Sequence, residues 1–164
     1  MKVNLVFLLF ISLSTRICSV AQTQTPTISN FKSLGSLQKN AKRPLVIFIH
    51  TDWCRYCLAM QNKTFADPKV IALLNTQYYF LMLNNAHAKD ITFLGKTYTY
   101  KATGIETGGH ELAEQLARKN QQINFPTTVI IGTNDTINLQ IDSFVPPQQF
   151  FKILTNYLRL SQLK

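Results

Sequence analysis

Apolar residues in the first half of the chain follow a helical spacing, then an unbroken run, then a helical spacing again. Phe31, Leu34 and Leu37 recur every three residues, which predicts a helix that ends near residues 40–42. Residues 44–49 form a continuous apolar run, as expected for a strand that is buried on both faces of a sheet. A helix over 54–63, a second helix beginning at Pro68 and a strand over 78–83 are predicted to follow.

The second half of the chain contains a hairpin pattern before the helical and strand patterns return. Residues 91–100 predict a hairpin that turns at Gly95-Lys96, and Gly108-Gly109 is expected to open a helix over 110–119. Strands are predicted over 127–131 and 137–144, with turn residues between them. Pro146-Pro147 should begin the last helix, whose apolar positions are spaced by three and four: Phe150, Ile153, Leu154, Tyr157 and Leu158.

The amino terminus has the organisation of a signal peptide. Lys2 is followed by an apolar stretch over 5–13 and by the small-x-small sequence Ser19-Val20-Ala21, which predicts export with cleavage near Ala21. The apolar stretch is shorter than the roughly 20 residues that span a bilayer. An uncleaved anchor is one alternative, and lipid attachment at Cys18 is another, although the residues before Cys18 suit such a site poorly.

The rest of the chain is expected to form a tether and one domain. Residues 22–30 are rich in Thr, Gln and Ser and predict a flexible tether, while 31–164 are long enough to bury a core. Hydrophobic residues make up 46% of the chain and charged residues 15%, which indicates a globular protein. Without Lys2 and Arg16, 15 basic residues face 8 acidic ones, a net charge of +7. These bases are scattered and not clustered, so nucleic-acid binding is not predicted.

The sequence Trp53-Cys54-Arg55-Tyr56-Cys57 carries the candidate chemistry. Two residues between the cysteines match one helical turn, so both sulfurs can lie on one face and form a reversible disulfide. A cysteine at a helix N-terminus faces unpaired N–H groups and the positive end of the helix dipole, which favours the reactive thiolate. Because Cys18 is expected to leave with the signal peptide, these are the two cysteines of the mature chain.

Two other roles of the cysteine pair, as a structural disulfide and as part of a zinc site, are less well supported by the sequence. A structural disulfide that closes so short a loop would constrain the unfolded chain little. A zinc site would need further ligands, and only His50, His87 and His110 could supply imidazoles. His50 lies at a strand end close to the pair, where it could contact the site or simply end the strand. His110 and Glu111 could open a helix or act as a proton shuttle, and the former use is favoured.

The chain resembles exported proteins of the thioredoxin fold. The resemblance rests on the strand over 45–49, the Trp53 to Cys57 motif, and Phe125-Pro126-Thr127 leading into a strand, in an order that covers most of 31–160. It implies an α/β fold with a central mixed β-sheet flanked by helices. Relative to a minimal thioredoxin, residues 84–108 would be an insertion that contains the hairpin.

The resemblance also implies a role for each matching residue. Cys54 would be the exposed nucleophile and Cys57 the resolving thiol, with no cofactor and no metal. The Phe125-Pro126 bond would be cis and lie beside the cysteines, where the backbone could pair with an extended substrate. Trp53, Arg55, Tyr56, Phe125 and Pro126 would form the substrate-binding surface.

Two departures from the family pattern affect the expected chemistry. The buried acid that many thioredoxins carry six residues before the first cysteine is replaced by Phe48, and its usual lysine partner by Met82. The familiar proton relay should therefore be absent. Arg55 and Tyr56 replace the usual Gly-Pro, and the Arg55 charge should favour a thiolate at Cys54.

These observations predict a periplasmic thiol:disulfide oxidoreductase that acts on protein disulfides, more as a reductase than as an oxidant. Its partners would be protein thiols or disulfides and a membrane protein that donates electrons, and the chain is expected to be a monomer. A copper(I) metallochaperone of the same fold is one alternative, because thiolates suit that ion. A non-catalytic interaction module is the other.

Overall fold

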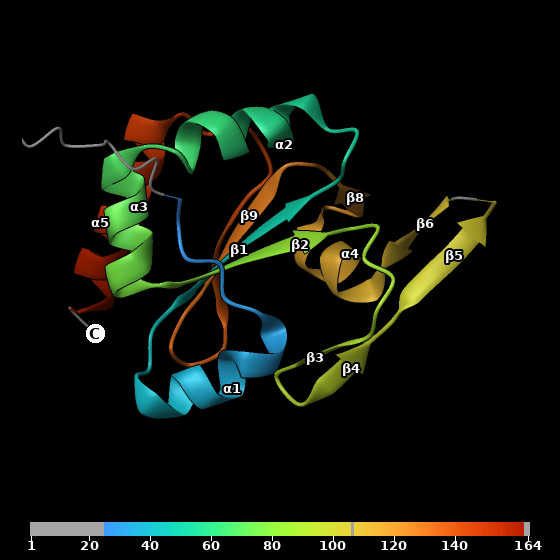
Figure 1. Cartoon of the computed structure of the whole chain (residues 1–164), viewed down its shortest axis with the longest axis horizontal. Helices are drawn as coiled ribbons and strands as arrows, with labels where there is room; N and C mark the ends of the chain where they lie inside the picture. The colour runs from blue at the N-terminus through green and yellow to red at the C-terminus, as the bar shows by residue number, and fades with distance from the viewer. Residues whose placement is uncertain (1–24, 106, 163–164) are drawn as a thin grey trace, which may run out of the picture.

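The computed structural model describes residues 25–105 and 107–162. Its centre is a four-stranded sheet with the strand order β10-β9-β1-β2 (Figure 1). β1 (Leu45–His50) runs parallel to β2 (Tyr79–Asn84) and antiparallel to β9 (Thr127–Ile131). β9 also pairs antiparallel with β10 (Ile137–Ile141). The mixed central sheet that the resemblance implied is therefore confirmed, and β1 is an interior strand.

Helices cover both faces of this sheet, as Figure 1 shows. α2 (Arg55–Ala59), α3 (Pro68–Gln77) and α5 (Pro147–Ser161) pack on the face that carries Val46 and Phe48. α1 (Phe31–Asn40) and α4 (Glu111–Ala117) pack on the opposite face, against Ile47 and Ile49. Because β1 sends alternate side chains to two covered faces, its continuous apolar sequence is buried from Leu45 through Ile49.

Local sequence determines where the helices begin. The Asn30 side chain caps α1 by accepting a hydrogen bond from the Ser33 N–H, and Asp67 caps α3 by accepting from Lys69 and Val70. Proline occupies the first turn of α3 and of α5, as the sequence predicts. The helix expected over 54–63 is also present, but its second half is a π-helix, η1 (Met60–Thr64), in which the Phe65 N–H donates to the Met60 carbonyl.

The region between β2 and β9 differs most from the sequence-based expectation. The predicted hairpin is present as β3 (Ile91–Phe93) and β4 (Lys96–Tyr98), but its two turn residues are Leu94 and Gly95. Both have positive φ, at 49° and 79°, so the prediction of a turn at Gly95-Lys96 was wrong by one residue.

A second hairpin follows that the sequence analysis did not predict. β5 (Tyr100–Gly104) pairs with β6 (Thr107–His110), and Figure 1 shows this hairpin projecting from the body of the molecule. The helix predicted over 110–119 is present as α4 (Glu111–Ala117), but Gly108 and Gly109 do not open it. Both glycines lie in β6, where the Tyr100 ring and the Glu114 carboxylate leave no room for a β-carbon. α4 ends at Ala117, and β7 (Arg118–Lys119) then pairs with β8 (Gln122–Ile123).

The segment before α1 contacts the free edge of β2. Ile28 forms a parallel bridge with Phe80, and the Ser29 N–H donates to the Phe80 carbonyl. The Thr27 N–H donates to the Asn75 side chain on α3. The expected signal peptide lies outside the described residues, as does Cys18. Within the described residues, no helix has the length and apolar character needed to cross a membrane.

Candidate active site

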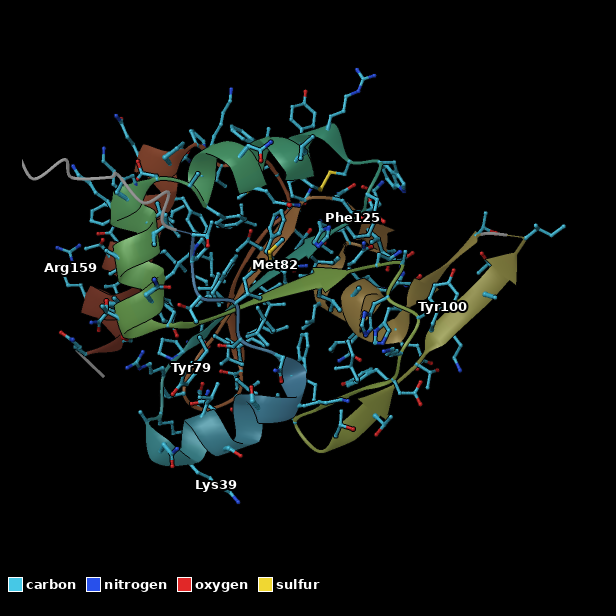
Figure 2. All side chains as sticks on the ribbon, viewed as in Figure 1. Lys39, Tyr79, Met82, Tyr100, Phe125 and Arg159 are labelled. Carbon is cyan, nitrogen blue, oxygen red and sulfur yellow. A yellow bond between two sulfur atoms is a disulfide. The ribbon has the colours of Figure 1, made fainter. Side chains whose placement is uncertain are left out.

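Cys54 and Cys57 meet at the carboxyl end of β1, where the chain enters α2. They form a disulfide, drawn as a yellow bond in Figure 2, with their Cα atoms 5.2 Å apart. Cys54 is the N-cap of α2, and its Sγ accepts a hydrogen bond of 3.1 Å from the Cys57 N–H. The Cys54 N–H donates in turn to the Thr51 carbonyl. The first cysteine thus occupies the helix N-terminus, a position that stabilises a thiolate once the disulfide opens.

The two sulfur atoms differ in access. The Cys57 side chain is fully buried, whereas Cys54 retains 6% of its surface. Cys57 packs with Met60 and Phe48 in the core layer beneath α2. A substrate therefore reaches Cys54 from solvent more easily than it reaches Cys57.

Aromatic side chains surround the disulfide on the outside of the molecule. Trp53 is 77% exposed and Tyr56 is 68% exposed, which is unusual for such large side chains. The Trp53 ring meets the half-buried Phe125 ring edge to face at a centroid distance of 6.1 Å. Arg55 is exposed at the first position of α2. Phe125 is joined to the buried Pro126 by a cis peptide bond, the isomer that the resemblance implies.

The structure therefore brings Phe125 from a distant part of the sequence to the cysteine motif. It also adds two apolar neighbours that the sequence analysis missed. Phe144 lies 6.4 Å from the Tyr56 ring, and Leu58 is exposed one residue beyond Cys57. The position of Leu58, four residues after Cys54 on a helix, could have indicated its place on this surface. For Phe144, which lies in the loop before α5, no such signal exists.

The position six residues before Cys54, where many thioredoxins carry a buried acid, is apolar in this structure. Phe48 is fully buried and lies opposite Met82 in the register of β1 and β2. His50 is the nearest imidazole in sequence, and its ring stacks on Phe48 at 5.6 Å. Burial lowers the pKa of His50, while the negative charge of Asp52 opposes this effect. The Asp52 carboxylate accepts a hydrogen bond of 2.7 Å from the Asn84 side chain.

The other candidate polar residues lie away from the disulfide. His110 is the N-cap of α4 on the opposite face of the sheet, where its Nδ1 accepts from the Leu112 N–H. Glu111 accepts hydrogen bonds from the Thr99 backbone and hydroxyl. His87 packs against the His110 ring at 5.7 Å. The helix-opening role of His110 and Glu111 is thus confirmed. Over 25–105 and 107–162, no cluster of three or more His, Cys, Asp or Glu residues could hold a metal ion.

Comparison with known proteins agrees with this geometry. Residues 31–158 match a family described as the thioredoxin-like domain. Over 86 residues the chain is 34% identical to the thiol:disulfide interchange protein DsbD of Vibrio vulnificus (strain CMCP6), a match that covers 46% of this chain and 14% of that protein. The chain thus corresponds to only a small part of that relative's length.

Two solved structures share the fold at low sequence identity. A DsbH oxidoreductase superposes with a TM-score of 0.56 at 13% identity, covering 84% of this chain and 88% of that one. A thioredoxin from Thermus thermophilus superposes with a TM-score of 0.56 at 17% identity, covering 82% and 88%. Since the family match spans the sheet, its helices and the cysteine motif, the chain belongs to the thioredoxin-like domain family.

Proposed function

We propose that this chain is a thiol:disulfide oxidoreductase that acts on protein disulfides through Cys54 and Cys57. The observation that carries the proposal is the Cys54–Cys57 disulfide at the start of α2, with the first sulfur near the surface and the second buried. A pair so arranged can alternate between dithiol and disulfide. The 34% identity to part of a thiol:disulfide interchange protein supports the same chemistry.

In the reductive direction, the Cys54 thiolate attacks one sulfur of a substrate disulfide, and the other substrate sulfur leaves as a thiolate. Cys57 then attacks Cys54 in the resulting mixed disulfide. This second exchange forms the Cys54–Cys57 bond and releases the remaining substrate sulfur. The substrate gains two electrons and two protons, while the two cysteines lose the same number. An external dithiol must then reduce the protein again.

The exposed aromatics supply a surface for the substrate. Trp53, Tyr56 and Phe125 surround the disulfide, so an unfolded or loop segment can bury apolar side chains there. Phe125 precedes β9, whose pairing with β1 begins at Thr127 opposite Ile49. Its backbone therefore lies outside the sheet and is free to pair with an extended chain next to Cys54. Arg55 places a positive charge beside the attacking sulfur.

We further propose export of the chain to the periplasm, with cleavage near Ala21, and a membrane protein as the electron donor. Residues 31–164 would be the catalytic domain of a monomer. The flexible tether expected over 22–30 is not proposed for residues 27–29, because they contact β2 and α3. The signal-peptide pattern of the sequence supports export. The partial identity to a thiol:disulfide interchange protein supports a place in disulfide exchange.

The decisive experiment measures the reduction potential of residues 22–164 in glutathione and dithiothreitol buffers, followed by thiol alkylation. A potential near or below roughly −250 mV is expected and would identify a reductase. A potential above about −180 mV would identify a disulfide donor or isomerase instead. Cys54→Ser should abolish exchange, and Cys57→Ser should trap the mixed disulfide. The absence of a reversible two-electron transition, together with about one retained copper(I) per reduced chain, would replace the proposal with the metallochaperone.

A further inference from the structure

The fully buried position of Cys57 raises the question of where its proton goes. Cys57 must become a thiolate to attack Cys54 in the mixed disulfide, and ionisation inside an apolar layer is unfavourable without a nearby proton acceptor. The buried polar side chains among the described residues are Thr51, Thr64, His110, Thr127 and Thr128. This set contains no carboxylate, and its one imidazole lies on the opposite face of the sheet.

The two tyrosines of this core layer cannot serve as the acceptor. The Tyr78 hydroxyl donates to the Leu154 carbonyl, and burial raises the pKa of Tyr78. Burial also raises the pKa of Tyr157, whose ring packs against Tyr78. Both phenols therefore stay protonated near neutral pH and cannot accept a proton from a thiol.

His50 is the titratable residue that the described strands of the central sheet direct to the face carrying the cysteines. Alternation along β1 directs Val46, Phe48 and His50 to the same face, and the stacked rings of Phe48 and His50, inclined by only 16°, agree with this. Val46 and Phe48 belong to the same buried cluster as both cysteines. His50 is the last residue of β1, so its half-buried ring lies at the sheet end where α2 begins.

The surroundings of the ring favour a neutral imidazole. Burial lowers the pKa of His50, and the charge of Asp52 and a hydrogen bond with the Thr51 backbone oppose this shift. The neighbouring strands present no charge at this end, since β2 carries Met82 and Asn84 and β9 begins with Thr127 and Thr128. From α2 come the two cysteines and the exposed Arg55. Asp52 is thus the acidic group that acts on the ring.

We propose that His50 accepts the proton of Cys57, directly or through one water molecule, when the mixed disulfide is resolved. The inference rests on the proposed exchange function. As the proton moves to the imidazole, the Cys57 sulfur attacks Cys54, the Cys54–Cys57 bond forms and the bond from Cys54 to the substrate sulfur breaks. The electron pair leaves with the substrate sulfur, which takes up a proton from solvent. The imidazolium then releases its proton, so the ring is unchanged after each turnover.

The test uses Ellman's reagent, 5,5′-dithiobis(2-nitrobenzoate), on the reduced protein. The first coloured thiolate reports attack by Cys54, and the second reports intramolecular resolution by Cys57. We expect His50→Gln to slow the second phase by at least about tenfold at pH 7, with the first phase changed less than about twofold. The loss should shrink at alkaline pH, where the Cys57 thiol ionises without a base. His87→Gln, which alters a histidine outside this face, should match the unsubstituted protein.

A second variant keeps the proposal testable if His50→Gln folds poorly. Asp52 raises the pKa of His50, so Asp52→Asn should move the acidic fall of the second-phase rate to lower pH. Equal second-phase rates and pH profiles in His50→Gln and the unsubstituted protein would overturn the assignment, as would equal slowing of both phases. If the unsubstituted protein shows no second phase, the proposed function fails rather than this inference.

Discussion

The cysteine loop and the β5–β6 hairpin leave the same sheet end but are held in different ways. The loop joins β1 to α2, and its base lies in an interior strand with residues from Leu45 to Ile49 buried on both faces. Among the described residues, the two strands of the hairpin pair only with each other (Figure 1). The β5 strand is exposed from Lys101 to Gly104. Rigidity at the disulfide therefore comes from the core, while the hairpin depends on a few contacts at its root.

Those root contacts are polar and local. The His110 N–H donates to the Asn85 carbonyl, and the Glu111 N–H donates to the Thr99 carbonyl. Figure 2 shows Tyr100 near the root of the projecting hairpin, far from the yellow disulfide. Because β5 has no buried residue, the hairpin should open at a lower free energy than the sheet. The chain thus places its chemistry next to a fully buried strand and away from the exposed hairpin.

The largest contrast between the two regions should appear in stability. Ile47→Ala removes a fully buried side chain from β1 and should lower the free energy of unfolding by about 3 kcal/mol, through lost burial and an internal cavity. Ile105→Ala, at the 95% exposed tip of the hairpin, should change it by less than about 0.5 kcal/mol. Urea unfolding of both variants measures the difference. Equal losses would mean that the hairpin tip is packed rather than free.

The root of the hairpin should give the next largest effect. His110→Ala removes the acceptor that caps α4 and the ring contact with the Lys89 carbonyl, so we expect a loss of about 2 kcal/mol. His110→Asn keeps a short acceptor at the cap and should recover about half of that loss. Amide exchange over 99–111 would locate the change. A loss spread evenly over the sheet would contradict a local role.

The same residue should make stability depend on pH. Burial lowers the pKa of His110 below its ordinary 6.5, and the hydrogen bond to Lys89 opposes this effect. The unfolded chain therefore binds more protons than the folded one just below pH 6.5, so stability must fall as pH decreases through this range. Burial also lowers the pKa of His50, so this residue contributes a pH dependence of the same sign. Unfolding free energies at pH 5 and 7.5 should differ less in His110→Asn than in the unsubstituted protein, and an unchanged difference would refute this prediction.

Sequence patterns predicted the regions whose structure is determined by burial and failed where local backbone geometry decides. The run over 44–49, the cysteine helix and Pro68 all produced elements at the expected places, because burial and helix capping act over a few residues. The role of Phe125 beside Trp53 followed only from resemblance, since a contact between residues 72 positions apart leaves no local pattern. The prediction for Gly108 and Gly109 failed because glycine is common at helix boundaries but also permits close contacts in strands.

The missed turn of the β3–β4 hairpin leads to a smaller prediction. Leu94 and Gly95 both adopt positive φ, which disfavours a side chain at either position. Gly95→Ala should cost about 1 kcal/mol through backbone strain alone, because its added β-carbon meets open space. Leu94→Asn creates the favoured Asn-Gly turn and should recover up to about 1 kcal/mol. Thermal unfolding should show a lower melting temperature for Gly95→Ala and a higher one for Leu94→Asn. A destabilised Leu94→Asn would show that packing of Leu94 outweighs its backbone strain.

The smallest effects should separate the two regions by activity rather than stability. Trp53 is exposed beside the disulfide, so Trp53→Ala should slow the reduction of insulin several-fold while leaving the reaction with a small disulfide nearly unchanged. Its stability should shift by less than about 1 kcal/mol, because little of the side chain is buried. Ile105→Ala is the matched control, since it removes another large exposed apolar group, 95% exposed against 77% for Trp53, from the hairpin tip. If the control slows insulin reduction as much as Trp53→Ala does, the hairpin contacts the substrate and the division between the two regions fails. If neither variant slows it, the protein substrate contacts the site mainly through the backbone next to Phe125.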